Sequence, residues 1–197
     1  ETPAAPMAPV TRLQLVSTSL AGAVVAAALA VGIALVRFRA VQPLAISHSP
    51  LGTQLIEGLL VGAAFGVGAA TLFLRAPAFA GGRAKAREVL RTAHLSRVDI
   101  ALMALAAGVG EELLFRAALQ PLMGLWFSAV LFTAVHYWVP LKGIGLVMYG
   151  TFVFTVSIAL GLLLQSGGLI AAMTAHTVVD LIILFVARAK LQSTGAR

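Results

Sequence analysis

The chain has no cysteine and few charged side chains, and these two shortages exclude whole classes of function. Among its 197 residues there is no Cys, so disulfides, cysteine-rich metal sites and thiol nucleophiles are excluded, cysteine transpeptidases included. Only 11% of the residues are charged whereas 60% are hydrophobic, and the mean hydropathy is +0.99. These values lie far outside the range of soluble proteins and indicate an integral membrane protein.

Acidic residues are half as numerous as basic ones, 7 against 14, which gives a formal net charge of +7. The basic residues are grouped between apolar runs, as the positive-inside rule expects of cytoplasmic loops. The excess of basic residues is therefore explained by the orientation of the chain in the membrane and does not indicate a nucleic-acid partner. We expect an integral membrane protein with both termini in the cytoplasm.

Six apolar runs make up most of the chain, each close to the roughly 17–25 residues that a spanning helix needs. We expect an all-α, polytopic bundle of about six transmembrane helices. The first run is too long for a typical signal-peptide core and is interpreted as a retained helix. The runs cover approximately 13–36, 51–74, 98–120, 122–139, 143–164 and 168–187.

No soluble domain fits between these runs, so 13–190 is expected to form one integral membrane domain. A disordered lead, 1–12, would precede it and a tail, 191–197, would follow it. Gly62 and Gly66 in the second run form a Gly-x-x-x-Gly pattern, which we attribute to close packing within the bundle and not to dimerisation.

Basic residues are interspersed with apolar ones between the second and third runs. This pattern is typical of an amphipathic helix at the membrane surface, although a solvated basic loop explains it equally well. Both interpretations place the segment on the cytoplasmic side. The basic residues are Arg75, Arg83, Lys85, Arg87, Arg91 and Arg97.

Three ionisable side chains, Glu111, Glu112 and Arg116, interrupt the third apolar run. A charge at the middle of a membrane helix costs roughly 2.5–3.5 kcal/mol, so such residues mark functional sites; a structural ion pair is the alternative. Glu112 and Arg116 are four positions apart, share a helix face and can neutralise each other. Glu111 lies roughly 100° around the helix from Glu112, so Arg116 cannot easily pair with it as well. An unpaired carboxyl in an apolar site can act as a base near neutral pH.

Two later runs carry further polar residues with the same spacing of four. The Phe132 ring can pack beside the His136 imidazole, and His176 shares a face with Asp180. At 1.5 Å per residue, Glu112, His136, His176 and Asp180 lie roughly 14, 18, 12 and 18 Å from the outer membrane face. We therefore expect three helices to bring these side chains together in one layer.

A buried Glu with His can deprotonate water while other polar groups hold an oxyanion, which suggests an intramembrane peptidase. The sequence has no His-Glu-x-x-His zincin motif, no Gly-x-Ser-x-Gly elbow and no second helical Asp for an aspartyl dyad. A zinc site formed by Glu111, His136 and His176 is an alternative by residue type. A proton-coupled transporter would also use such residues, but the sequence shows no inverted repeat.

The order Glu-Glu-x-x-x-Arg, Phe-x-x-x-His and His-x-x-x-Asp resembles that of the CPBP intramembrane proteases, the CAAX protease and bacteriocin-processing (Abi) family. The motif-bearing core is about 98–187. The resemblance implies that Glu111 and His136 activate water, and that Glu112 and Arg116 form a supporting pair. It further implies that His176 and Asp180 stabilise the oxyanion. No cofactor is implied. Asp180 stands where the prenyl-protein proteases often have Asn, so it must be protonated to donate, or else orient His176.

The resemblance also implies a substrate: a membrane-anchored or lipidated protein cleaved near its C-terminus, through prenyl-protein processing or bacterial C-terminal sorting. Phe132 and Glu57 are candidates for contacts with that substrate, and a shallow interfacial carboxylate is the alternative for Glu57. A non-catalytic protein of the same fold, such as an immunity protein or a sensor scaffold, is the competing hypothesis.

Overall fold

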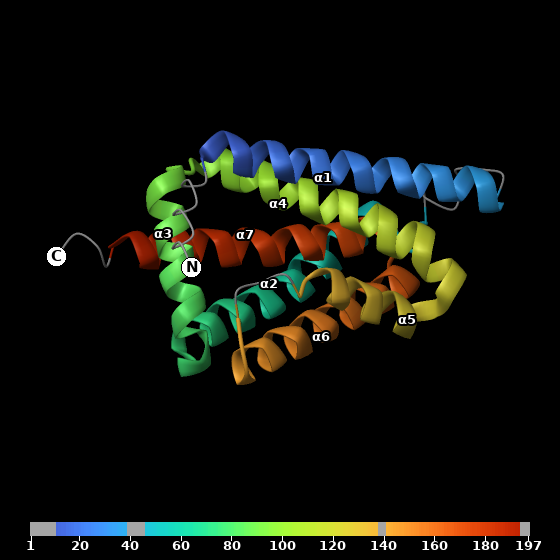
Figure 1. The fold of residues 1–197 in the computed structure, drawn as a ribbon. Helices are drawn as coiled ribbons and strands as arrows, with labels where there is room; N and C mark the ends of the chain where they lie inside the picture. Colours follow the sequence, from blue (N-terminus) through green and yellow to red (C-terminus); the bar gives the residue numbers. More distant parts are fainter. Residues whose placement is uncertain (1–10, 39–45, 138–140, 194–197) are drawn as a thin grey trace, which may run out of the picture.

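A computed structural model of the chain describes residues 11–38, 46–137 and 141–193. The expected lead, 1–12, and tail, 191–197, therefore fall largely outside the described residues. The elements run α1 (Arg12–Ile33), η1 (Ala34–Phe38), α2 (Leu51–Arg75), η3 (Pro77–Phe79), α3 (Ala80–Ala93), α4 (Arg97–Glu112), η4 (Leu113–Leu119), α5 (Gln120–Val135), α6 (Ile144–Ser166) and α7 (Leu169–Ser193). The expected all-helical bundle is confirmed (Figure 1).

Among the residues that the structure describes, four helical stretches are long and apolar enough to cross a bilayer: α1 with most of η1, α2, α6 and α7. The chain is thus a membrane protein. The third predicted run, 98–120, is helical as well, but its end forms the π-helical segment η4 directly after Glu112. Such segments in α-helices are frequent at functional sites.

The fourth predicted run, 122–139, is shorter than expected. Gly124 has φ 80° and ψ 168°, a backbone conformation that glycine adopts readily and other residues rarely adopt. This residue breaks the helix after its first turn. Beyond that kink α5 continues only from Leu125 to Val135, roughly 16 Å at about 1.5 Å per residue. This is about half of a bilayer core of roughly 30 Å. His136 therefore lies at the end of a half-length helix.

Helix α7 occupies the middle of the bundle, with α4, α2 and α6 packed around it (Figure 1). Small residues allow the closest of these contacts. A Cβ atom built on Gly62 would lie 2.6 Å from the carbonyl oxygen of Ala175, and one on Gly66 would meet Ile182. The Gly-x-x-x-Gly pattern of α2 therefore packs within the bundle, against α7.

Helix α1 lies along α4 on the outside of the bundle (Figure 1). The Ser96 side chain caps α4, and the carboxylate of Asp99 completes the capping box. Asp99 also lies 2.7 Å from the Arg12 guanidinium, so an ion pair joins the first turns of α1 and α4. The start of α1 and the end of α7 lie at the same end of the bundle (Figure 1).

The basic segment between the second and third runs is helical, so it is not the solvated loop that was the alternative. Helix α3 crosses the end of the bundle at a steep angle to the other helices (Figure 1). Its apolar face buries Leu90 and Ala93 in a cluster with Ala187 of α7. Arg83 donates hydrogen bonds to the carbonyl oxygens of Phe73 and Ala76 at the end of α2.

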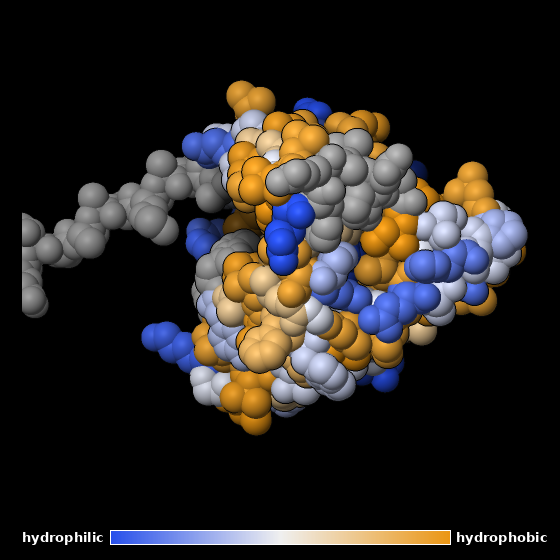
Figure 2. Space-filling model, turned by 90° about the vertical axis from the view of Figure 1, so that its right-hand side faces the viewer, coloured by the Kyte–Doolittle hydropathy of each residue, from blue (hydrophilic) through white to orange (hydrophobic). Residues whose placement is uncertain are grey.

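The exterior of the bundle is strongly apolar. Large hydrophobic side chains are exposed along the helices, among them Val24, Val36 and Phe127. Hydrophobic residues also cover much of the bundle end shown in Figure 2. Such extensive exposed apolar surface marks a binding surface, and in a membrane bundle it is the surface that contacts lipid.

Candidate active site

Glu112 and Arg116 form an ion pair that is fully inside the bundle. The Glu112 and Arg116 side chains are 0% and 1% exposed, and their closest charged atoms, Oε2 and Nε, are 3.1 Å apart. The second Glu112 oxygen, Oε1, lies 2.8 Å from Nδ1 of His176. A carboxylate only accepts, so Nδ1 carries the hydrogen of this bond.

The buried Arg116 guanidinium has two further partners. It donates a hydrogen bond of 3.2 Å to the hydroxyl of Ser157 on α6, and it lies 4.7 Å from the centre of the Phe132 ring. A buried charge needs such compensation. Sequence analysis missed Ser157, because a lone serine in an apolar helix carries no spacing signal.

Glu111 and His136 form a second, partly exposed pair. Oε2 of Glu111 lies 3.6 Å from Nε2 of His136, and the two side chains are 31% and 24% exposed. Nδ1 of His136 lies 2.7 Å from the Phe132 carbonyl oxygen, which can only accept, so the hydrogen is on Nδ1. In the neutral ring Nε2 then keeps its lone pair and faces Glu111. The separation is longer than a direct hydrogen bond, and a single water can contact both atoms.

The Phe132 ring lies between the two histidines. It stacks on His136 with ring centres 4.4 Å apart and an angle of 27°, and its centre is 5.9 Å from that of His176. Phe115 packs edge-on against the same ring, with ring centres 4.9 Å apart. Phe132 is only 3% exposed, so its main contacts are with the site's own side chains.

His176 and Asp180 border a cavity together with His136. Nε2 of His176 is 3.7 Å from Oδ2 of Asp180, too far for a direct hydrogen bond. The cavity has a volume of about 120 Å³ and lies between α5, α6 and α7. Tyr149 also lines it, and no spacing pattern in the sequence selects this residue. The lining consists of Phe132, His136, Tyr149, Phe152, Val153, Val156, His176, Val179, Asp180 and Ile183.

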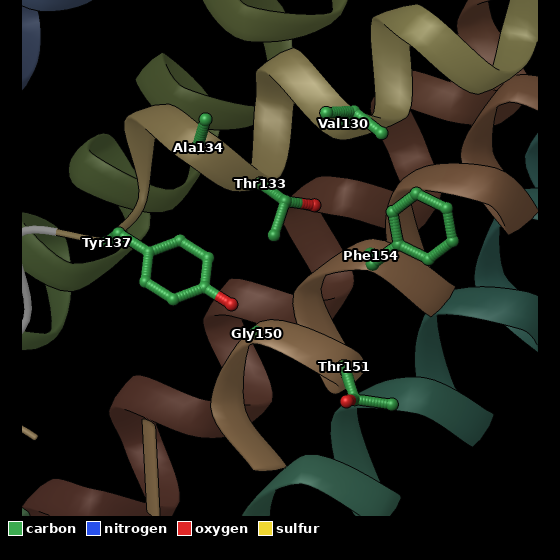
Figure 3. Close-up of a pocket in the computed structure, with 7 residues that line it drawn as sticks. All are labelled: Val130, Thr133, Ala134, Tyr137, Gly150, Thr151 and Phe154. Atoms are coloured by element: carbon green, nitrogen blue, oxygen red, sulfur yellow. The ribbon is translucent and has the colours of Figure 1, made fainter. Parts of the chain in front are cut away.

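A larger groove of about 500 Å³ lies on the other side of the contact between α5 and α6. Figure 3 shows the Tyr137 ring reaching from the end of α5 towards α6 at Gly150. A Cβ atom on Gly150 would overlap the Tyr137 hydroxyl, so glycine makes this approach feasible. The lining residues are Val130, Thr133, Ala134, Tyr137, Gly150, Thr151 and Phe154.

Two of the expected features lie apart from this arrangement. Glu57 is placed beside Gly167, at the turn between α6 and α7, and is not among the side chains that line the cavity. Across the described ranges, no three His, Asp or Glu side chains converge as ligands of one metal ion. The alternative zinc site, Glu111, His136 and His176, stays a prediction.

The part of the chain that carries the site matches a known family. Residues 93–182 match the family described as "Type II CAAX prenyl endopeptidase Rce1-like". Over this segment, which is slightly less than half of its length, the chain is similar to the Rce1-like family. The segment runs from the end of α3 into α7 and includes Glu111, Glu112, Arg116, Phe132, His136, His176 and Asp180. The family resemblance seen in the three motifs is confirmed.

One curated relative is described as "Uncharacterized protein YpbD" of Bacillus subtilis (strain 168). It is 35% identical over 82 residues, which are 41% of this chain and 41% of the relative. The chain therefore spans less than half the length of the relative that it matches. No solved structure matches the chain.

Proposed function

We propose that this Rce1-like protein is an intramembrane endopeptidase that hydrolyses a peptide bond near the membrane end of a protein substrate. The observation that carries the proposal is the placement of Glu111 beside His136, with Oε2 and Nε2 3.6 Å apart. His136 also borders the cavity that His176 and Asp180 line. The histidine that we propose as part of the water-activating pair and the histidine that we propose as the oxyanion donor therefore border the same cavity.

Glu111 and His136 activate the water in this mechanism. A water between Oε2 and Nε2 gives up a proton to the pair, and its oxygen attacks the carbonyl carbon of the substrate. General-base assistance of this kind contributes roughly 10²–10⁴-fold to a rate. The Phe132 carbonyl fixes the His136 tautomer, so the lone pair of Nε2 faces the reacting water.

His176 is the donor to the oxyanion that forms when water adds to the carbonyl. Its Nδ1 hydrogen is held by Glu112, so a proton on Nε2 makes the ring an imidazolium that donates into the cavity. An ionised Asp180 accepts hydrogen bonds only, so its role is to favour that proton and to orient the ring. Glu112 and Arg116 position His176 and do not touch the substrate.

Collapse of the tetrahedral intermediate completes the reaction. The carbonyl re-forms, the bond from carbon to nitrogen breaks, and the electron pair leaves with the nitrogen. The proton taken up by Glu111 and His136 is transferred to that nitrogen. One water is consumed, and the products are a carboxyl group and an amine. In this proposal the groups that take up and return the proton are the side chains of Glu111 and His136.

The substrate that we propose is a membrane-anchored or lipidated protein, cut close to its C-terminus. The apolar exterior of the bundle suits a substrate that arrives within the membrane. The Rce1-like match favours a CAAX-type tail, and a bacterial sorting tail would present a peptide bond at a similar depth. A bacterial inner-membrane location with cytoplasmic termini fits either substrate.

Comparative proteomics of membrane-protein C-termini tests this proposal in cells. Cells that produce the intact protein are compared with cells that produce Glu111→Ala at the same level. We expect uncleaved C-terminal tails to accumulate in the variant. Identical C-termini in both strains would overturn the proposal, and an unchanged cellular phenotype with Glu111→Ala would favour a non-catalytic scaffold.

A further inference from the structure

Glu111 borders a second space, on the opposite side of α4 from the cavity. Helices α1 and α4 enclose a groove of about 240 Å³, and Glu111 lines it. The same side chain reaches His136, which belongs to the cavity between α5, α6 and α7. Glu111 therefore connects the outside of α4 with the proposed reaction site.

The walls of this groove are small and partly polar. Two hydroxyl side chains, Thr18 and Ser19, come from α1, and the remaining residues carry at most a methyl group. Gly110 of α4 packs directly on the backbone of Ala23, which brings the two helices close below the groove. Besides Glu111, the lining residues are Thr18, Ser19, Gly22, Ala23, Ala106 and Ala107.

The chemistry of Glu111 identifies what fills the groove. The Oε2 atom of Glu111, which faces His136, is buried and makes no hydrogen bond to the residues that the structure describes. A carboxylate at this depth needs hydrogen-bond donors, which lipid tails cannot supply. The groove volume of about 240 Å³ far exceeds the roughly 10–15 Å³ that one water requires, and the two hydroxyls offer further partners.

We infer that the groove between α1 and α4 is a water-filled path that delivers the hydrolytic water to Glu111. This inference rests on the proposed function for the use of the water, but the hydration of the groove stands independently of it. It gives α1 a part in the reaction, although the Rce1-like match begins only at residue 93. Thr18 and Ser19 are then positioning residues for water.

Cysteine labelling measures the hydration without any substrate, because the chain has no native cysteine. Ser19→Cys, which lies in the groove, is compared in membranes with Val24→Cys, which lies on the exposed apolar side of α1. Thr92→Cys on α3 is the reactive control. We expect a water-soluble methanethiosulfonate to label Ser19→Cys at least about tenfold faster than Val24→Cys. Equal, background-level labelling of both, with Thr92→Cys reactive, would overturn the inference.

A filled groove should then slow hydrolysis. Gly22 and Gly32 both lie on α1 with open space where a Cβ would be, but only Gly22 lines the groove. We expect Gly22→Leu to lower kcat by at least about tenfold with little change in KM, and Gly32→Leu to match the intact protein. Equal kcat values for the two variants would contradict the path.

The two experiments separate the failure of the inference from the failure of the proposed function. If the protein cleaves no substrate but Ser19→Cys is labelled, the result supports the hydrated groove and contradicts the proposed peptidase function. If the protein cleaves its substrate but Ser19→Cys is not labelled, the result supports the peptidase function and contradicts the water path.

Discussion

The imidazole of His176 lies with Nδ1 2.8 Å from Oε1 of Glu112, although 64 positions separate the two residues. The other oxygen of Glu112 belongs to the buried ion pair with Arg116. One carboxylate thus joins the buried Arg116 guanidinium to the imidazole that faces the cavity. The ion pair and the orientation of His176 depend on each other.

Replacing Glu112 is therefore expected to affect stability and activity together. In Glu112→Gln an NH₂ group replaces one of the two carboxylate oxygens, so either Arg116 or His176 faces a donor where it had an acceptor. Breaking a buried pair costs roughly 3–5 kcal/mol, which a lowered thermal unfolding midpoint in detergent would report. The double variant Glu112→Leu/Arg116→Met should regain most of that stability without regaining peptidase activity. Full activity in the double variant would show that His176 needs no carboxylate at Nδ1.

Phe132 is expected to act on the rate through the histidine on which it stacks. Phe132→Leu keeps an apolar side chain but removes the aromatic stacking on His136 and the contact with the Arg116 guanidinium. Aromatic contacts of this kind contribute about 0.5–1.5 kcal/mol, so kcat should fall up to roughly tenfold with KM nearly unchanged. Steady-state kinetics with a membrane-anchored peptide measures both constants. A raised KM at an unchanged kcat would instead make Phe132 a substrate contact.

The helical pairs of the site could be predicted from the sequence because helix geometry alone determines them. Residues four apart share a face, and this was sufficient for Glu112 with Arg116 and for Phe132 with His136. The common depth of three helices followed from the rise per residue and the order of the apolar runs. The hydrophobic length of the runs was likewise sufficient for the all-helical class.

The contacts between helices could not be predicted in the same way. The pairing of Glu112 with His176 depends on how α4 faces α7, and no local spacing determines that orientation. The shortened α5 depends on the backbone conformation of Gly124, which a hydropathy pattern does not report. The same holds for Ser157, for Tyr149 and for the groove beside α1.

The close contact between α2 and α7 leads to a prediction about stability alone. A side chain on Gly62 would meet the Ala175 backbone, whereas Gly68 on the same helix has open space around it. Gly62→Leu should lower the thermal unfolding midpoint in detergent, because overpacking a tight contact costs about 1–3 kcal/mol. Gly68→Leu is the matched control and should unfold like the intact protein. An equal shift of the unfolding midpoint in both variants would mean that the close approach at Gly62 does not stabilise the contact between α2 and α7.

The approach of Tyr137 to Gly150 should hold His136 in place, since the two residues are adjacent in the chain. In Gly150→Ala the added methyl group overlaps the Tyr137 hydroxyl and displaces the end of α5. Misplacement of a catalytic group by about 1 Å can cost as much as roughly 10²-fold, so we expect a clear fall in kcat. Adding Tyr137→Leu removes the overlap and should restore part of the rate. No recovery in the double variant would place the effect of Gly150→Ala elsewhere.

Peptide-bond cleavage in proteoliposomes by Glu111→Gln tests the central claim most directly. The rate is compared with those of the intact protein and of Glu88→Gln, which alters an exposed carboxylate on α3. Each protein is assayed with and without a chelator of divalent metals. We predict that Glu111→Gln remains folded and loses roughly 10²–10⁴-fold in kcat, while Glu88→Gln keeps the full rate and the chelator changes nothing. A Glu111→Gln protein that cleaves as fast as the intact one would contradict the account.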